Sequence, residues 1–298
     1  MKTPLFTGSG AAICTPFTAD DRINFDKLAE LIDFQIENGT TAIIICGTTG
    51  ETSTQTLEEH IETVDFCVKH VAGRVKVIAG SGSNDTRAAL CLSQEAEKSG
   101  ADGLLVVTPY YNKATQRGLA DHFFHIADRV NLPIVLYNVP SRTGVGFTAD
   151  TYKTLSKHPL INGTKEASGD FSLLAQTIAA CGDDLHIWSG NDDHTVPMLA
   201  LGARGLISVA ANVIPRQMAE MCDAALAGDF KRAAAIQLQY SALLDGLFME
   251  VNPIPVKTAM NLMGMDVGHL RMPLCEMDPG NLAKLKAIMV DAGLSLTQ

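Results

Sequence analysis

Repetition is the feature of this sequence that most constrains its fold. Eight short runs of apolar and β-branched residues recur along the chain, and segments with helical spacing separate them. Within each run the hydrophobicity is nearly continuous rather than alternating, which is typical of parallel strands that are buried on both faces. We place the eight predicted strands at residues 10–15, 42–46, 75–79, 103–108, 133–138, 160–165, 185–189 and 205–209.

The segments between the runs read as helices. Apolar residues at positions 25, 28, 31, 32 and 36 share one helical face, with Asn24 as the predicted N-cap and Gly39 as the predicted stop. Segment 88–99 repeats this pattern and ends at Gly100. Eight strand–helix units in about 225 residues predict a (β/α)8 TIM barrel. The competing architecture is a doubly wound sheet, whose dinucleotide-binding form needs a glycine pattern that Gly80-Ser81-Gly82 does not complete.

The strand signal stops near residue 228, so the chain divides into two predicted regions. Residues 1–228 form the barrel that carries the active site, and residues 229–298 form a small C-terminal helical extension. In the extension, one helical stretch over 230–249 is broken by Pro253 and Pro255, and two further helices follow. No low-complexity linker separates the two regions.

Composition excludes several classes of partner. Lysine and arginine total 23 against 33 aspartates and glutamates, giving a formal charge of −10, and no basic block offsets it. Nucleic acid is therefore not an expected partner. No run reaches 18 apolar residues, the N-terminal residues lack a signal-peptide pattern, and the seven cysteines form no C-x-x-C pair. We expect a cytoplasmic protein with reduced thiols and no membrane partner.

Lys165 is the most informative candidate for chemistry. Active sites of such barrels form at the C-terminal ends of the strands, and Lys165 closes the sixth predicted strand. Burial there would lower the pKa of the amine and leave a neutral nucleophile for carbonyl groups. The alternative is a lysine held in a salt bridge at the barrel mouth. Because side chains alternate along a strand, Glu166 would then point away from the interior and have a structural role.

Other strand ends carry residues with two interpretations each. Tyr137 ends the fifth strand, where its phenol could transfer protons or simply pack. Thr48 and Thr49 lie between glycines, where they could bind a carboxylate or form a plain turn. Arg142 follows in a loop bounded by proline and glycine, either as a carboxylate ligand or as a surface residue.

We predict no metal and no organic cofactor. Asn191-Asp192-Asp193-His194 suggests metal ligands, but consecutive side chains point in different directions, so a solvated loop or a helix N-cap is expected. The sequence also lacks the H-E-x-x-H, G-x-x-x-x-G-K-[ST] and G-x-S-x-G motifs.

Several strings taken together resemble the 4-hydroxy-tetrahydrodipicolinate synthase (dihydrodipicolinate synthase) family. The resemblance covers essentially the whole chain, with the strings in the family's order. It implies condensation of pyruvate with aspartate 4-semialdehyde on the way to diaminopimelate and lysine. The strings are Gly47-Thr48-Thr49-Gly50-Glu51, Tyr110-Tyr111-Asn112, Tyr137-Asn138-Val139-Pro140-Ser141-Arg142-Thr143-Gly144, Lys165-Glu166-Ala167 and Asn252-Pro253-Ile254-Pro255-Val256-Lys257.

The resemblance also implies a role for each matched residue. Lys165 would form the Schiff base with pyruvate, and Tyr137 would donate and accept protons. Thr48 and Thr49 would bind the pyruvate carboxylate, and Thr49 would link Tyr137 to Tyr111 from a neighbouring subunit. The resemblance thereby implies a homotetramer built as a dimer of dimers.

Further positions concern the second substrate. Arg142 stands where the family binds the semialdehyde carboxylate, and Gly190 and Ile207 stand where the backbone lines the pocket. The rival readings are a sister class I aldolase, such as N-acetylneuraminate lyase or a 2-keto-3-deoxy sugar acid aldolase, and a non-catalytic sensor. Tyr111 together with Arg142 favours the semialdehyde, and the full set of catalytic residues argues against the sensor.

One departure from the family concerns inhibition by lysine. His60, Asn84 and Tyr110 match the family's lysine site, as a possible vestige of it. Leu57 and Ala88, however, stand where a histidine and a glutamate are expected. Without that carboxylate the ammonium of lysine loses its main charge partner, so we predict weak or absent inhibition.

Overall fold

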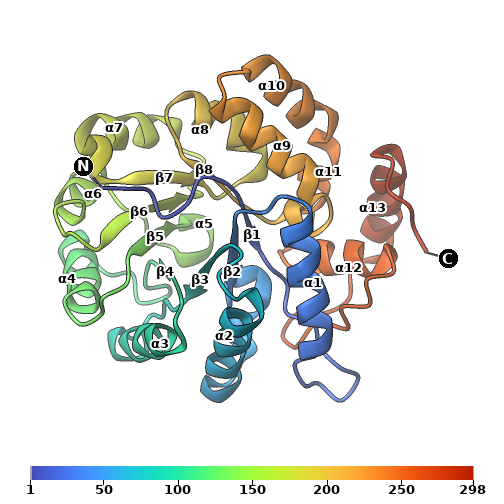
Figure 1. The fold of residues 1–298 in the computed structure, drawn as a ribbon, viewed down its shortest axis with the longest axis horizontal. Helices are drawn as coiled ribbons and strands as arrows, with labels where there is room; N and C mark the ends of the chain where they lie inside the picture. Colours follow the sequence, from blue (N-terminus) through green and yellow to red (C-terminus); the bar gives the residue numbers. More distant parts are fainter. Residues whose placement is uncertain (1, 298) are drawn as a thin grey trace.

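The computed structural model describes residues 2–297, so Met1 and Gln298, the outermost residues of the two predicted regions, lie outside it. Eight parallel strands form a closed barrel in chain order (Figure 1). The prediction of a (β/α)8 TIM barrel is confirmed. The strands are β1 (Gly8–Ala12), β2 (Ala42–Ile45), β3 (Lys76–Gly80), β4 (Gly103–Val107), β5 (Ile134–Asn138), β6 (Ile161–Glu166), β7 (His186–Ser189) and β8 (Gly205–Ser208).

The strand boundaries agree with the predicted ones to within one residue, except for β1. That strand begins two residues earlier than predicted, because Gly8 and Ser9 pair with Gly205 and Leu206 of β8. It ends at Ala12, although the apolar run continues beyond it. Pairing across the closing seam of the barrel, and not hydrophobicity, decides which residues of this segment form the strand.

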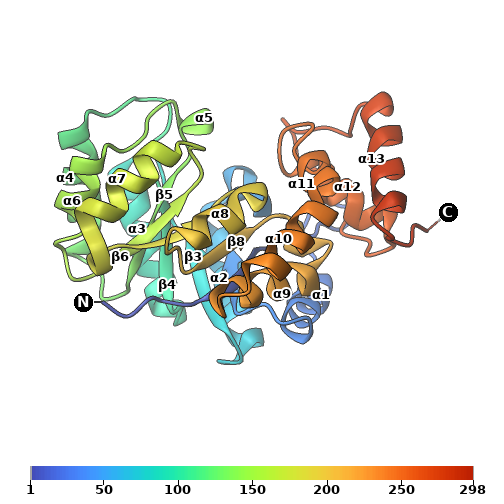
Figure 2. The same ribbon diagram turned by 90° about the horizontal axis from the view of Figure 1, so that it is seen from above.

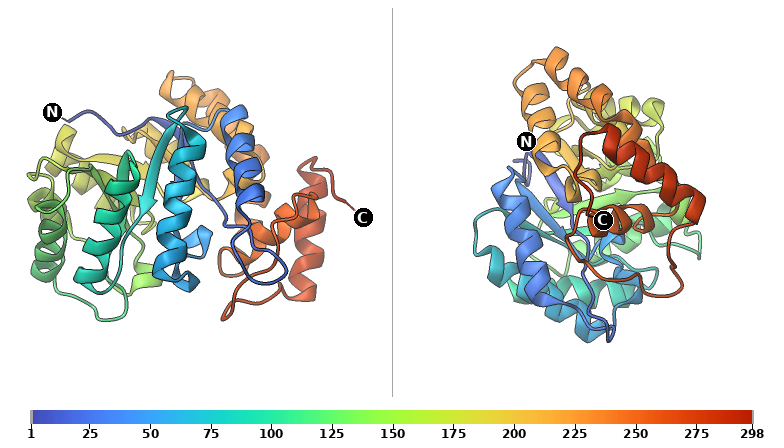
Figure 3. Two further views of the ribbon diagram at one scale, coloured as in Figure 1. Left: turned by 60° about the horizontal axis from the view of Figure 1, so that its bottom comes forward. Right: turned by 90° about the vertical axis from the view of Figure 1, so that its right-hand side faces the viewer.

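Helices surround the barrel on its outer side (Figures 1 and 3). Asn24 caps α1 as predicted by accepting a hydrogen bond from the Lys27 amide at 3.0 Å, and Gly39, with a φ of +89°, follows its end. Predicted segment 88–99 begins two residues earlier, because Asp85 supplies the cap. The helices are α1 (Phe25–Glu37), α2 (Leu57–Val71), α3 (Thr86–Ser99), α4 (Gln116–Ala127), α5 (Pro140–Thr143), α6 (Ala149–Leu155), α7 (Phe171–Cys181), α8 (Thr195–Ala200), α9 (Pro215–Leu226), α10 (Phe230–Gln239), α11 (Ser241–Gly246), α12 (Ile254–Leu262) and α13 (Pro279–Asp291).

Two hydrophobic cores hold these elements together. The larger core fills the space between the strands and the surrounding helices. The smaller one fills the barrel itself with side chains such as Ile44, Ile78 and Trp188. Phe6, which precedes β1, stacks on Trp188 with 5.0 Å between the ring centroids. The barrel is therefore packed from its N-terminal side and can open only at the C-terminal ends of its strands.

The C-terminal helices α12 and α13 form a lobe beside the barrel (Figure 2). The single helical stretch predicted over 230–249 is wrong in one respect, because α10 and α11 are separate helices that meet at Tyr240. The break buries Leu243 and Leu244 while Leu238 stays 71% exposed, so tertiary packing overrides the local pattern. Pro255 lies in the first turn of α12, where backbone N–H groups make no hydrogen bond within the helix, so the N–H that proline lacks is not needed.

A buried ion pair fastens this lobe to the barrel. Lys257 of α12 contacts the Glu51 carboxylate at 2.7 Å, and both side chains are almost fully buried. The Lys257 amine also donates to the His269 carbonyl at 2.6 Å, and the Glu51 carboxylate accepts from the Arg271 amide at 2.9 Å. The loop after β2 is thus bonded to two points of the C-terminal region. Within residues 2–297, no helix is both long enough and apolar enough to cross a membrane.

Candidate active site

A cleft of 490 Å³ opens where the strands end. Its walls come from both regions of the chain, because the segment before α12 closes one side. The lining residues include most of the predicted site residues. They are Thr48, Thr49, Tyr137, Val139, Ser141, Arg142, Lys165, Ala167, Gly190, Asn191, Val209, Phe248, Met249, Glu250, Val251 and Asn252.

Lys165 lies in this cleft with only 5% of its surface exposed. It pairs in register with Tyr137 on β5 and Trp188 on β7, and its amine lies 4.4 Å from the centroid of the Tyr137 ring. A Cβ atom on Gly190 would come within 3.1 Å of Lys165 Cε and 2.7 Å of Ala167 Cβ, so a glycine is needed there. Among residues 2–297, Lys165 has no ion-pair partner, so the salt-bridge interpretation has no support.

Glu166 points the opposite way, as strand alternation predicts. Its carboxylate accepts hydrogen bonds from the Tyr152 hydroxyl at 2.8 Å, the Asn138 amide at 3.0 Å and the Ser168 backbone N–H at 2.7 Å. All these partners lie outside the barrel interior or at its rim. The predicted structural role of Glu166 is confirmed, because its carboxylate is bonded on the side of the strand opposite to the cleft.

Tyr137 on β5 and Thr49, which follows β2, reach the same cleft from separate parts of the barrel. Tyr137 is 7% exposed and belongs to the hydrophobic cluster inside the barrel. Thr49 is buried, and its hydroxyl accepts a hydrogen bond from the Asn252 side-chain amide at 3.0 Å. Thr48 and Thr49 lie in a short 3₁₀ helix, η1 (Thr48–Gly50), whose tight packing depends on Gly50. A Cβ at Gly50 would lie 3.2 Å from the Ile13 carbonyl oxygen.

Asn252 is a site residue that the sequence reasoning missed. Its side-chain amide donates to Thr49, and its backbone carbonyl accepts from Arg142 Nη2 at 3.0 Å. Its Oδ1 atom is buried and has no donor among residues 2–297. Asn252 therefore connects two groups that the sequence places far apart. The sequence did hold one indication, because Asn252 begins one of the strings that match the family. It lies after residue 228, however, outside the predicted barrel that was expected to carry the active site.

Arg142 and Tyr111 are placed differently from each other. Arg142 lines the rim of the cleft, with an exposed side chain anchored by the bond to Asn252. Tyr111 lies in the loop after β4, is 88% exposed and does not line the cleft of its own chain. Its backbone has a φ of +74°, which is uncommon for a residue with a side chain. Ile207 is fully buried inside the barrel and is also not among the lining residues.

The residues that match a lysine site lie away from this cleft. His60 on α2 is buried, and its Nε2 contacts the Gly80 carbonyl at 2.7 Å. Burial lowers the pKa of His60, which favours the neutral ring. The Asn84 carbonyl accepts from Asn112, whereas Leu57 and Ala88 are exposed and carry no charge. Tyr110 is 39% exposed.

The acidic string after β7 has a structural function. Asp192 is 1% exposed and accepts hydrogen bonds from the Ser208 hydroxyl and from the Val209 and Ala210 amides at 3.1 and 3.2 Å. The expectation of a solvated loop is therefore wrong for Asp192, because its carboxylate organises the turn after β8. Within residues 2–297, no group of three or more potential ligands is placed to hold a metal ion.

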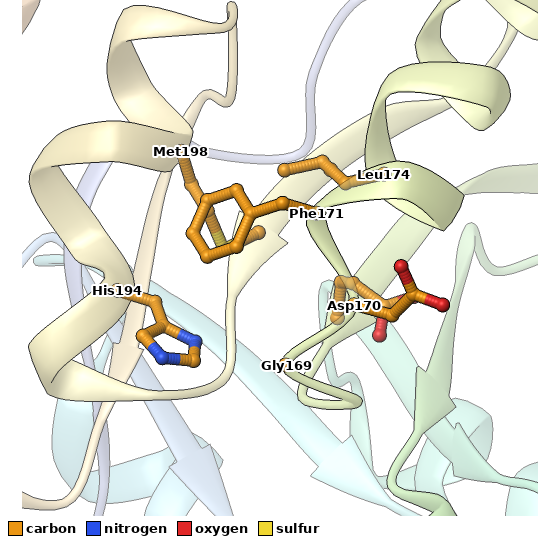
Figure 4. Close-up of a pocket in the computed structure, with 7 residues that line it drawn as sticks. Gly169, Asp170, Phe171, Leu174, His194 and Met198 are labelled. Carbon is orange, nitrogen blue, oxygen red and sulfur yellow. The ribbon is translucent and has the colours of Figure 1, made fainter.

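A second hollow lies between α7 and α8, as Figure 4 shows. Phe171 points into it beside His194, Leu174 and Met198, and the Phe171 and His194 rings meet edge-on with centroids 5.3 Å apart. Its volume is only 10 Å³, at the limit of what one water molecule needs. The hollow is too small for an organic substrate.

Comparisons with known proteins agree on one group of enzymes. Residues 5–292 match the Dihydrodipicolinate synthetase family. The chain is 53% identical over 292 residues to a 4-hydroxy-tetrahydrodipicolinate synthase from Thermoanaerobacter sp., covering 98% of each chain. It is similar to the dihydrodipicolinate synthase structure from Aquifex aeolicus, with a TM-score of 0.96 and 46% identity over 98% of this chain and 100% of that one. It is also similar to the pyruvate-complexed enzyme from Acinetobacter baumannii, with a TM-score of 0.95 and 40% identity over 97% and 100%.

Proposed function

The chain belongs to the dihydrodipicolinate synthetase family, and we propose that Lys165 carries its reaction as the Schiff-base lysine. The protein is a lyase that condenses pyruvate with aspartate 4-semialdehyde to 4-hydroxy-tetrahydrodipicolinate, in diaminopimelate and lysine biosynthesis. One observation carries the assignment of Lys165. Its buried side chain lies in the cleft at the end of β6, beside Tyr137.

The first half of the reaction forms a covalent bond to pyruvate. The neutral amine of Lys165 adds to the ketone carbon, and one proton moves from nitrogen to oxygen to give a carbinolamine. Tyr137 then gives a proton to the hydroxyl, the C–O bond breaks to release water, and the nitrogen lone pair forms the C=N bond of an iminium that keeps its N–H. Thr48 and the buried Thr49 bind the pyruvate carboxylate; their place in the lining of the cleft that holds Lys165 supports this role. None of these steps needs a metal or an organic cofactor.

The second half forms the carbon–carbon bond and the ring. The iminium acidifies the pyruvate methyl group, and loss of one methyl proton gives an enamine. The enamine carbon attacks the aldehyde carbon of the second substrate, whose oxygen takes up a proton. The substrate amine then adds to the iminium carbon and displaces Lys165, which leaves as the free amine.

Proton transfer in this scheme requires a second chain. Tyr137 is the proton donor and acceptor, and Thr49 links it to Tyr111 of a neighbouring subunit. The exposure of Tyr111 and its absence from the cleft of its own chain support a role in a partner's site. The assembly is a homotetramer, as a dimer of dimers, and sedimentation equilibrium at several protein concentrations would test it. The free cysteines suit a reducing compartment, which supports a cytoplasmic location.

Arg142 binds the carboxylate of the semialdehyde at the rim of the cleft. The change Arg142→Ala removes a charge-assisted hydrogen bond worth about 2 kcal/mol, so the KM for the semialdehyde should rise about 30-fold. Trapping of pyruvate on Lys165 should be unchanged, because that bond forms before the second substrate binds. Arg129→Ala is the matched control, because the Arg129 side chain is exposed and, among residues 2–297, bonds only to the His125 carbonyl. Equal KM values for wild type and Arg142→Ala would contradict the role.

Feedback by lysine should be weak. Leu57 and Ala88 offer no charge to the ammonium of a bound lysine, and burial favours the neutral form of His60. We expect no substantial loss of activity at lysine concentrations below about 1 mM, a typical scale for metabolite binding. A lysine titration at fixed substrate concentrations measures this. The double change Leu57→His and Ala88→Glu should increase the inhibition, and strong inhibition of the wild type would contradict the prediction.

The function itself is tested by the choice of second substrate. Purified protein is given pyruvate together with aspartate semialdehyde, N-acetylmannosamine or glyceraldehyde, and the loss of pyruvate is followed. Consumption only with the semialdehyde supports the synthase. Consumption with a sugar aldehyde would leave Lys165 and Tyr137 in their roles and assign the chain to sugar-acid metabolism. If pyruvate is consumed with none of the aldehydes and forms no adduct with the protein, the result would favour a non-catalytic sensor.

A further inference from the structure

Asp192 is a buried carboxylate that the reaction described above does not use. It lies two residues after Gly190, the glycine that packs against Lys165 Cε. Its Oδ2 atom accepts the backbone N–H of Val209, and Val209 lines the same cleft as Lys165. Asp192 is therefore directly behind the wall of the cleft, between the ends of β7 and β8.

Of the other charged or titratable groups near Lys165, Glu166 is buried too, but its carboxylate points away from the cleft and accepts hydrogen bonds from Tyr152, Asn138 and Ser168. Tyr137 on β5 is a phenol, and Arg142 on α5 is a cation at the exposed rim. Glu250 lines the cleft but is partly exposed, and its carboxylate is bonded to the start of α13. Cys222 on α9 is fully buried, and burial raises the pKa of its thiol, which favours the neutral form.

We propose that Asp192 is a positioning residue for the Schiff base, whose buried negative charge stabilises the positive iminium on Lys165. This inference rests on the proposed function, because it needs the iminium to form. A charge that is shielded from solvent acts strongly over several ångströms, whereas an exposed one is screened. The three hydrogen bonds to Asp192 favour the ionised carboxylate and hold it in one place.

The two charges are coupled in both directions. Burial raises the pKa of Asp192, and the positive charge of Lys165 opposes that rise. The ionised carboxylate is therefore stabilised most when Lys165 is cationic. By linkage, the ionised carboxylate stabilises the cationic iminium by the same free energy. Removing the negative charge lowers the pKa of the iminium, so the cationic adduct is lost at a lower pH.

The change Asp192→Asn isolates this charge. The new amide carbonyl can accept from Val209 and Ala210, and the amide N–H can donate to Ser208 Oγ, so the hydrogen bonds can be kept. At a pyruvate concentration below saturation, we expect about tenfold less adduct trapped by borohydride near neutral pH. The alkaline limb of the trapping profile should move down by about one pH unit.

Two controls separate charge from structure. Asp193→Asn makes the same chemical change at the following residue, whose side chain is 52% exposed, and should leave the trapping profile unchanged. Ser208→Ala removes two hydrogen bonds, the one to Asp192 and the one from the Ala211 amide, but leaves the Asp192 carboxyl group in place, so it should lower thermal stability and move the profile much less than Asp192→Asn does. If the pH profile of trapping for Asp192→Asn overlays that of the wild type while its thermal stability is lower, Asp192 has a structural role only and the inference is overturned.

The wild-type protein offers an independent measurement if Asp192→Asn does not fold. In protein labelled with ¹³C-aspartate, infrared difference spectra on adding pyruvate should show a change in an aspartate carboxylate band. Unchanged aspartate bands would overturn the inference while the trapped adduct still supports the proposed function. A wild type that forms no adduct at Lys165 would overturn the proposed function first, and this inference with it.

Discussion

The change Lys165→Ala should lower the condensation rate by at least about 10⁴-fold, because the covalent intermediate cannot form without the amine. The buried amine has no ion pair among residues 2–297, so its removal breaks no salt bridge, and Asp192 keeps its three hydrogen bonds. The fold should therefore survive. Borohydride reduction in the presence of pyruvate, followed by peptide mass mapping, should place the adduct on Lys165 in the wild type and nowhere in the variant.

Lys165→Met is the matched control, since it keeps the length of the side chain and removes the nucleophile. Both variants should retain the circular dichroism spectrum of the wild type. A pyruvate adduct that persists in either variant would assign the chemistry to another lysine. Full activity in the methionine variant would exclude the Schiff-base mechanism altogether.

The change Lys257→Met should lower the free energy of unfolding by about 3–5 kcal/mol, because it leaves the Glu51 carboxylate buried without a charged partner. Burial lowers the pKa of Lys257 and the Glu51 carboxylate opposes this, so Lys257 depends on Glu51 to remain charged. Urea unfolding measures the loss. The affinity for pyruvate should also fall, because Glu51 directly follows the helix that holds Thr48 and Thr49.

The double variant Glu51→Gln with Lys257→Met tests the cause. It removes both charges, and most of the lost stability should return. Lys69→Met breaks an ion pair whose lysine side chain is 73% exposed, and it should change the free energy of unfolding by less than about 1 kcal/mol. A single Lys257 variant as stable as the wild type would show that the C-terminal lobe is held by its apolar contacts alone.

The barrel could be predicted from the sequence because buried parallel strands leave a signal in single segments. The limits of that signal appear at β1, where Gly8 and Ser9 become strand only through their pairing with β8. They appear again at Tyr240, where the burial of Leu243 and Leu244 divides one helical pattern into two helices. Both features depend on contacts between distant residues, and no local pattern records them.

The residues of the candidate site also fall into two groups, those that a local pattern predicts and those that depend on contacts between distant residues. Lys165 and Tyr137 were predictable because strand ends meet at one mouth of a barrel. Asn252 was not, because its bonds to Thr49 and Arg142 span more than 100 positions of sequence. Asp192 was misjudged as solvated because an acidic string reads as exposed, and only the donors of the turn after β8 explain its burial.

The packing of Trp188 has a practical consequence. It is the single tryptophan of the chain, it is fully buried, and it pairs in register with Lys165. Its indole nitrogen has no hydrogen-bond partner among residues 2–297. Under excitation that selects tryptophan over the five tyrosines, the emission of this protein therefore comes from one indole, and we expect its surroundings to change when Lys165 acquires a substituent. The barrel carries its own optical probe, with which the occupancy of Lys165 can be followed in real time without a label or a coupling enzyme.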